Sequence, residues 1–304
     1  MAANLISPES LAEMETLKLR ARTLVESVLT GTHRSQQRGF SVDFAEHRDY
    51  SPGDDVRFLD WKLYGRRDRF YVRQFEDENQ LQAWILLDTS GSMLYRSEHS
   101  AMSKLEYAAC LAAAIGWIAC YQQDESGLLC FDGNTESSAG TYRGTAGANQ
   151  LINRLQTVID EATAQTSTTA DDESWHSLQM SVERVPERSI VFLLSDAFGD
   201  LAPLKRALTL LRRKECDVRF VHVLDAAEIM FPFEGSMLFR DLEGAGESRV
   251  MAKSIRAGYL KEFGQFLKDV QKIAGETNTQ YMQVETSQLV DRVLRKILHS
   301  GQPV

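Results

Sequence analysis

The chain has 304 residues, 43% of them hydrophobic and 25% charged, a balance that excludes a fibrous or mainly disordered protein. Its formal net charge of −9 argues against a general nucleic-acid binder, which needs a basic surface. At ~150 residues per domain, the length predicts one large or two modest domains.

The beginning of the chain carries no leader pattern. Residues 1–29 include Glu9, Glu13 and Lys18 and lack the apolar core of a signal peptide. The most apolar run, Ala108 to Tyr121, is shorter than the ~20 residues of a membrane-spanning helix. The four cysteines show no CxxC or metal-ligand spacing. We therefore expect a cytoplasmic protein without a membrane span.

Residues 1–80 are expected to form an N-terminal helix followed by a small β-rich extension. Apolar residues recur at helical spacing over 11–29. Residues 40–75 are dense in charged and aromatic side chains and predict short strands around a loop at 51–55. Residues 57–73 contain six basic residues and only two aspartates, which is a local basic surplus in an acidic protein.

Residues 81–304 predict an α/β domain. Strand-like apolar runs occur at 83–88, 127–131, 189–195, 218–224 and 280–284. Helical patterns lie between or after them, near residues 103–122, 148–162, 173–184, 201–214, 254–274 and 287–299. This alternation is typical of a doubly wound, mainly parallel sheet. We expect a hairpin at Gly140 to Gly147 and an inserted loop region at about 225–256.

Two of the predicted strands end in polar turns that carry carboxylates. Asp88, Ser90 and Ser92 follow the first strand, and Asp196 follows a neighbouring one. Ligands of such sheets collect at the carboxyl ends of the strands. A carboxylate and two hydroxyls on one turn favour Mg²⁺ or Mn²⁺, with a coordination position left for an outside carboxylate. An Asp-Thr-Ser turn can instead serve only as a helix cap or Asx turn.

The turn at residues 88–93 resembles the metal-ion-dependent adhesion site of von Willebrand factor A-type domains. The block HRDYSPGDDVR at 47–57, and the pieces Asp60-Trp61-Lys62 and Tyr71-Val72-Arg73, resemble the bacterial domain of unknown function 58 family. The resemblance covers roughly residues 20 to 300. It implies a von Willebrand A-like fold with an N-terminal extension, and no catalytic activity is established for this family.

The resemblance also implies a ligand set and a partner. Asp88, Ser90 and Ser92 match the first metal motif, and Asp196 matches its later aspartate. A threonine usually completes the set, and Thr169 is the favoured candidate here, with Thr168 and Asp172 as alternatives. Family members are similar to proteins encoded beside MoxR-type AAA+ ATPases. A MoxR-type ATPase and its client protein are therefore the expected partners of a metal-dependent adaptor in assembly or activation.

Two other functions stay open. Arg48, Arg57, Arg66 and Arg67 could form a partner-docking face while the metal site is vestigial, although pairing with nearby acidic residues would equally explain them. A Mg²⁺- or Mn²⁺-dependent hydrolase is the third hypothesis. The sequence shows no GxSxG, GxGxxG or P-loop motif, so we expect a binding protein rather than an enzyme.

Overall fold

The computed structural model describes residues 6–32, 47–49, 71–73, 82–132, 137–164, 171–240 and 247–299. The chain divides into two compact units: residues 1–32 with 81–304, and residues 33–80. The helix expected near the N-terminus thus belongs to the larger unit. In the smaller unit, β1 (His47–Asp49) pairs antiparallel with β2 (Tyr71–Arg73), with Arg48 opposite Val72.

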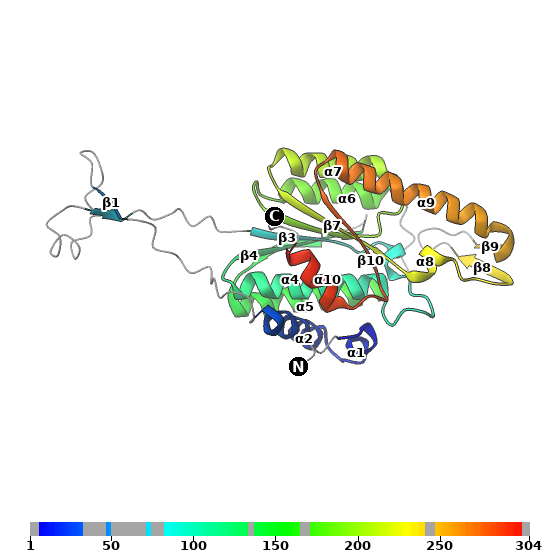
Figure 1. The fold of residues 1–304 in the computed structure, drawn as a ribbon, viewed down its shortest axis with the longest axis horizontal. Coiled ribbons are helices and arrows are strands. Elements are labelled where there is room, and N and C mark those ends of the chain that lie inside the picture. Colours follow the sequence, from blue (N-terminus) through cyan, green and yellow to red (C-terminus); the bar gives the residue numbers. More distant parts are fainter. Residues whose placement is uncertain are drawn as a thin grey trace. The chain divides into compact units, whose positions relative to one another are not determined.

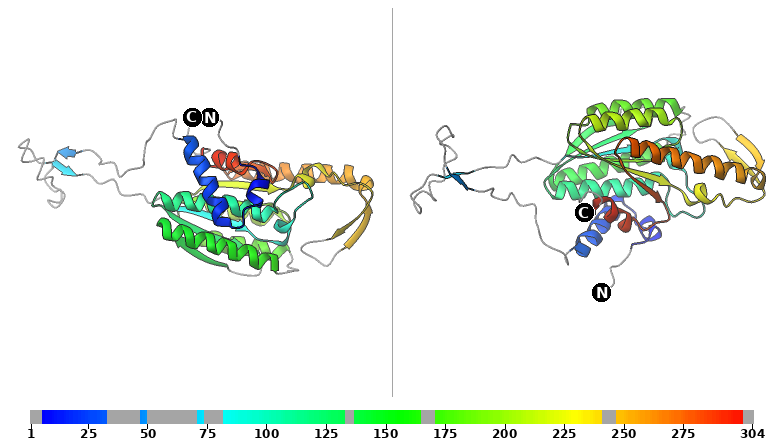
Figure 2. Two further views of the ribbon diagram at one scale, coloured as in Figure 1. Left: turned by 90° about the horizontal axis from the view of Figure 1, so that it is seen from below. Right: turned by 45° about the horizontal axis from the view of Figure 1, so that its top comes forward.

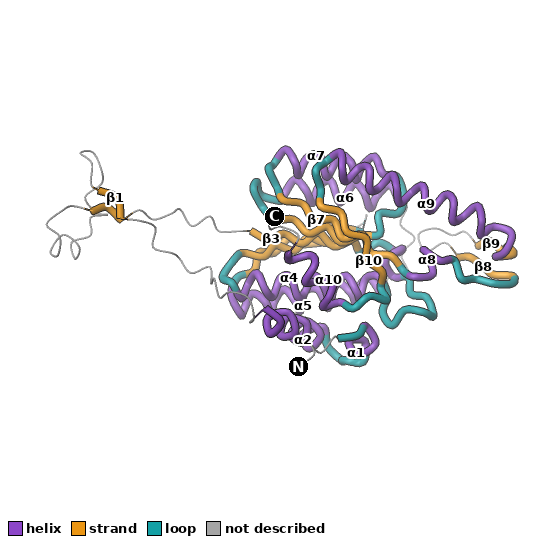
Figure 3. Tube along the Cα trace, in the orientation of Figure 1, coloured by secondary structure: helices purple, strands orange, loops and turns teal. Residues whose placement is uncertain are grey.

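A six-stranded sheet forms the centre of the larger unit (Figures 1 and 3). Its order is β10-β7-β6-β3-β4-β5, and only the edge strand β5 runs antiparallel to its neighbour. The strands are β3 (Gln82–Asp88), β4 (Glu125–Phe131), β5 (Ser137–Tyr142), β6 (Ile190–Ser195), β7 (Asp217–Leu224) and β10 (Gln280–Glu285). The doubly wound, mainly parallel α/β sheet expected from the sequence is confirmed.

Helices cover both faces of this sheet (Figure 2). One layer holds α4 (Lys104–Tyr121), α5 (Gly144–Ala164) and α10 (Val290–His299), with α1 (Pro8–Ala12) and α2 (Leu17–Thr32) outside them. The other layer holds α6 (Asp171–Arg184), α7 (Leu201–Arg213) and α9 (Ala252–Glu276).

The central strands are apolar without interruption because both of their faces are buried. In β3, Ile85 and Leu87 enter the core beneath α4, whereas Trp84 and Leu86 enter the core beneath α6 and α7. Side chains alternate between the two faces of a strand, so each apolar run supplies both cores at once. The last residue of β3, Asp88, is still buried but lies at the carboxyl edge of the sheet.

Helix α4 begins sharply where the polar loop after β3 ends. Ser103 accepts from the Glu106 backbone, and Glu106 accepts from the Ser103 backbone, which makes a capping box. The helix is buried almost all round, as its apolar sequence requires between the sheet and α2. Lys104, its first residue, is nevertheless fully buried as well.

The hairpin expected at residues 140–147 needs correction. Residues 140–147 do not form a hairpin, because β5 ends at Tyr142 and α5 begins at Gly144, which has φ +66°. The hairpin is instead the pair of β4 and β5. The region near 225–256 contains α8 (Ala226–Met230) and a hairpin of β8 (Ser236–Arg240) and β9 (Glu247–Met251) before α9. Among the helices described, we find none that is both long and apolar enough to cross a bilayer.

Candidate metal centre

Four of the predicted metal residues lie at or just after the carboxyl ends of two neighbouring strands: Asp88, Ser90, Ser92 and Asp196. Strands β3 and β6 run parallel, with Leu87 in register with Leu194, so the residues that follow them emerge side by side. Asp88 and Asp196 are 4% and 1% exposed. Two carboxylates are therefore buried close together at one edge of the sheet.

Asp88 is held by donors from both strand ends. Its Oδ1 accepts from the Ser90 backbone N–H at 3.0 Å, and its Oδ2 accepts from the Ser195 hydroxyl at 2.5 Å. Burial and, after it, the negative charge of Asp196 raise the pKa of Asp88 to about 7, against these hydrogen bonds. The Asp88 carboxylate therefore sits where positive charge would be favourable.

The turn after β3 brings two hydroxyls beside this carboxylate. Ser90 precedes the short 3-10 helix η2 (Gly91–Leu94), and its Oγ lies 3.1 Å from the Ser92 Oγ. Thr89 is directed elsewhere, since its N–H and hydroxyl both donate to the Phe131 carbonyl in β4. The intervening threonine thus fixes the turn, and Ser90 and Ser92 remain as the adjacent oxygen pair.

Asp196 is engaged by a buried lysine that the sequence analysis missed. Its Oδ2 accepts from Lys104 Nζ at 2.7 Å, and its Oδ1 accepts from the Phe198 N–H at 3.2 Å. Lys104 Nζ also donates to Glu228 Oε1 at 2.6 Å. Burial alone lowers the pKa of Lys104, but Asp196 and Glu228 outweigh it and hold that pKa above its usual range. Lys104 is therefore a charged ammonium between two carboxylates.

Helix α8 fixes the far end of this ion-pair network. Glu228 Oε2 accepts from the Asp225 N–H at 2.8 Å, and Asp225 Oδ1 accepts from the Ala227 N–H at 2.8 Å, which caps α8. Asp225 Oδ2 also accepts from the Ser97 N–H at 3.1 Å. The loop between β3 and α4 is thereby tied to the end of β7.

His222 in β7 forms a hydrogen bond with the backbone of the turn that carries Asp196. It is fully buried, with Nε2 2.7 Å from the Asp196 carbonyl oxygen and Nδ1 2.8 Å from the Tyr281 hydroxyl. Burial lowers its pKa to about 4, so it is neutral at physiological pH. Both ring nitrogens therefore have protein partners, and His222 is a hydrogen-bonded core residue rather than a metal ligand in this arrangement.

Several predicted site residues cannot be joined to this cluster. Thr169 and Thr168 lie outside the described residues, and Asp172 lies in the first turn of α6. Arg48 lies in β1 of the smaller unit. Arg57, Arg66 and Arg67 lie outside the residues that the structure describes.

The residues missed from the sequence are Lys104, Ser195 and Glu228. A lysine at the start of a largely apolar helix was the available signal, because a charge there needs a buried partner. Glu228 follows Asp225 at the spacing of a capping box, which identifies a helix start but not an ion pair. Only the fold brings these groups together, since Lys104 and Glu228 are 124 positions apart.

The donor set fits a small divalent cation that prefers oxygen. Asp88, Ser90 and Ser92 offer hard oxygens, and Asp196 adds a second carboxylate. Lys104 pairs with Asp196 and Glu228, and Asp88 adds a third carboxyl group beside Asp196, so acidic groups outnumber the ammonium. Among the described residues, we find no group of three or more His, Cys, Asp or Glu side chains that could hold a metal. Any ion here would therefore depend on the serine hydroxyls.

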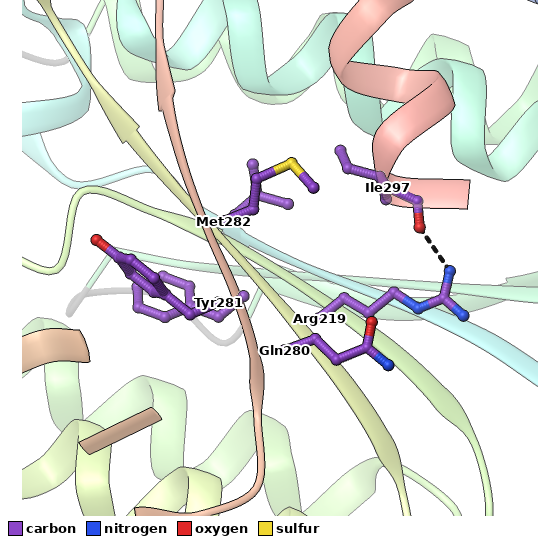
Figure 4. Close-up of a pocket in the computed structure, with 7 residues that line it drawn as sticks. Arg219, Gln280, Tyr281, Met282 and Ile297 are labelled. Atoms are coloured by element: carbon purple, nitrogen blue, oxygen red, sulfur yellow. Dashed lines mark hydrogen bonds between the residues drawn. The ribbon is translucent and has the colours of Figure 1, made fainter. Parts of the chain in front are cut away.

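A small pocket lies away from this edge. Arg219, Gln280 and Tyr281 line it together with residues of β7, β10 and α10, and Arg219 Nη1 donates to the Ile297 carbonyl at 2.7 Å (Figure 4). It adjoins the first halves of β7 and β10, whereas the metal residues follow strand ends. The pocket is therefore separate from the candidate metal centre.

Comparison with known proteins identifies relatives of unknown activity. The family model described as "Protein of unknown function DUF58" matches residues 46–265. Uncharacterized proteins of Mycobacterium tuberculosis and Mycobacterium bovis are each 25% identical over 238 residues, which are 78% of this chain and 72% of each relative.

Solved structures are similar at lower identity. The conserved hypothetical protein BatB from Bacteroides thetaiotaomicron is 18% identical, with a TM-score of 0.46 over 72% of this chain and 98% of that one. The SpRpn10 VWA domain is 11% identical, with a TM-score of 0.35 over 74% of this chain and 98% of that one. The sheet order and the helix layers are those of the doubly wound, mainly parallel α/β fold expected from the sequence, and the solved structures similar to it include a von Willebrand A-type (VWA) domain. Because the family model matches most of its length, the chain belongs to the DUF58 family.

Proposed function

We propose that this protein is an interaction module that binds an acidic side chain of a partner through a divalent cation. The fold and the family suggest a protein-interaction domain, and a cation at the candidate metal centre would provide the contact with the partner. The observation that carries the proposal is the placement of Asp88 beside the Ser90 and Ser92 hydroxyls, with Asp196 buried next to it.

Asp88, Ser90 and Ser92 would hold Mg²⁺ or Mn²⁺, with Asp196 contributing charge. Such an ion supplies Lewis acidity toward a carboxylate oxygen. Within the chain, Ser195 and the Ser90 N–H orient Asp88, and Lys104 orients Asp196. A single ion held largely by hydroxyls leaves room for an outside ligand, because Mg²⁺ does not demand an all-protein cage.

Metal binding to the purified full-length chain is the first test, with free Mn²⁺ measured by electron paramagnetic resonance. Asp88→Ala is expected to abolish Mn²⁺ binding, because it removes the carboxylate at the centre of the set. Asp200→Ala is the matched control: Asp200 lies at the same sheet edge but caps α7 through the Ala202 N–H at 2.9 Å. Equal Mn²⁺ binding by the wild type and Asp88→Ala would refute the site.

Partner binding is the second test, by affinity capture from a native lysate with Mg²⁺ or with EDTA. The partner expected from the family resemblance is a MoxR-type AAA+ ATPase or its client. The adaptor proposal requires that the wild type and Asp200→Ala retain this ATPase with Mg²⁺ only, and that Asp88→Ala does not. Retention in EDTA that is lost in Arg66→Glu/Arg67→Glu would assign docking to the basic block instead.

A further inference from the structure

A buried lysine, Lys104, forms an ion pair with Asp196, the second carboxylate of the candidate metal centre. Lys104 is fully buried, and its Nζ contacts Asp196 Oδ2 at 2.7 Å and Glu228 Oε1 at 2.6 Å. The same ammonium lies 4.8 Å from the centre of the Phe198 ring, where the face of an aromatic ring favours a cation. The Lys104 ammonium is thus enclosed by two carboxylates and the Phe198 ring, and none of these contacts is exposed to solvent on the lysine side.

This contact changes what Asp196 can offer to a metal ion. One of its oxygens accepts from Lys104 and the other from the Phe198 N–H. Glu228 is likewise committed, because its two oxygens accept from Lys104 and from the Asp225 N–H. Two of the three carboxylates in this cluster therefore already share one ammonium before any ion arrives.

We propose that Lys104 is a resident cation that weakens the binding of a divalent ion at Asp88, Ser90 and Ser92. The inference rests on the proposed metal site and concerns its affinity. Like charges repel more strongly in a buried, weakly screened site than in water, so an ammonium on Asp196 opposes a second cation there. The same ammonium stabilises the metal-free chain, since it prevents Asp196 and Glu228 from being buried without a partner.

The two effects predict opposite changes when Lys104 is removed. Lys104→Met keeps the length of the side chain and removes its charge. The metal-free variant is expected to be less stable than the wild type, because two buried carboxylates lose their shared partner. Its affinity for Mn²⁺ is expected to rise at least tenfold, because Asp196 is released to the ion.

The measurement is the Mn²⁺ dissociation constant of the full-length chain by electron paramagnetic resonance, with the melting temperature recorded in EDTA and in Mg²⁺. Lys205→Met is the matched control. Lys205 pairs with Glu276 at 2.6 Å on the surface, between α7 and α9, so its loss changes the net charge equally. Lys104→Met should bind Mn²⁺ tighter and gain more melting temperature from Mg²⁺, whereas Lys205→Met should match the wild type.

Glu228→Gln serves as a second variant in case Lys104→Met does not fold. It retains Lys104 and removes one negative charge, so it is expected to bind Mn²⁺ more weakly than the wild type. Unchanged or weaker binding by a folded Lys104→Met would overturn the inference, as would unchanged or tighter binding by Glu228→Gln. Mn²⁺ binding by Lys104→Met, with none detected for the wild type, would support the inference. Absence of binding in the wild type and all variants would instead overturn the metal site itself.

Discussion

Ser195 is expected to stabilise the protein more than an ordinary buried serine, because its hydroxyl makes two buried hydrogen bonds beside the candidate metal centre. It donates to Asp88 Oδ2 and accepts from the Ala197 N–H at 2.9 Å. Ala197 is buried and has φ +54°, in the left-handed region that side chains other than glycine rarely adopt. One hydroxyl therefore supports a buried carboxylate and a strained turn.

Ser195→Ala removes both hydrogen bonds at once. A hydrogen bond to a charged group contributes ~1.5–3 kcal/mol, and a buried N–H left without an acceptor costs ~1–3 kcal/mol. Since contributions of neighbouring groups do not simply add, we expect a loss of about 3 kcal/mol in the free energy of unfolding. Typical stabilities are ~5–15 kcal/mol, so this loss is readily measured.

Urea unfolding in EDTA tests this expectation at a pH well above 7, where Asp88 is ionised despite its raised pKa, with Ser189→Ala as the matched control. Ser189 lies just before the other end of β6, is 1% exposed, and donates to the neutral Pro186 carbonyl at 2.9 Å. A neutral hydrogen bond contributes ~1 kcal/mol, so the two variants should differ by about 2 kcal/mol. If Ser195→Ala is no more destabilising than Ser189→Ala, the charged hydrogen bond does not stabilise this edge and the reasoning is wrong.

Three further changes have definite expected outcomes in the same unfolding experiment. Gly127→Ala should destabilise by ~1–3 kcal/mol, because its Cβ would lie 2.4 Å from the Trp84 ring, and Trp84→Leu should reduce that penalty in the double variant. Gly258→Ala, in α9 with open space at its Cβ, should instead stabilise by ~0.5–1 kcal/mol, and a loss there would contradict the helix assignment. Tyr281→Phe leaves His222 Nδ1 without its partner and should cost ~1 kcal/mol; no change in unfolding would show that this hydrogen bond is not stabilising.

Local patterns in the sequence determined the elements that present the site. The uninterrupted apolar run of β3 ends at Asp88, and the buried run of β6 ends one residue before Asp196. Because parallel strands place their carboxyl ends at one edge, these two patterns alone predicted that the aspartates meet. The hairpin predicted at 140–147 was wrong, because its glycines serve three separate purposes. Gly140 lies in β5, Gly144 turns the chain into α5 with φ +66°, and Gly147 allows close approach to the Tyr142 backbone, 3.0 Å from where its Cβ would lie.

The partners of these carboxylates were decided only by the tertiary structure. Lys104 reaches Asp196 across 92 positions of sequence, and Ser195 reaches Asp88 across 107. No periodicity or local motif encodes such pairs, because they form only when α4 packs beneath the sheet and β6 joins β3 in register. The sequence by itself determined which oxygens stand at the edge of the sheet. The packing of distant elements decided how much charge surrounds them, because burial and long-range ion pairs arise only in the folded chain.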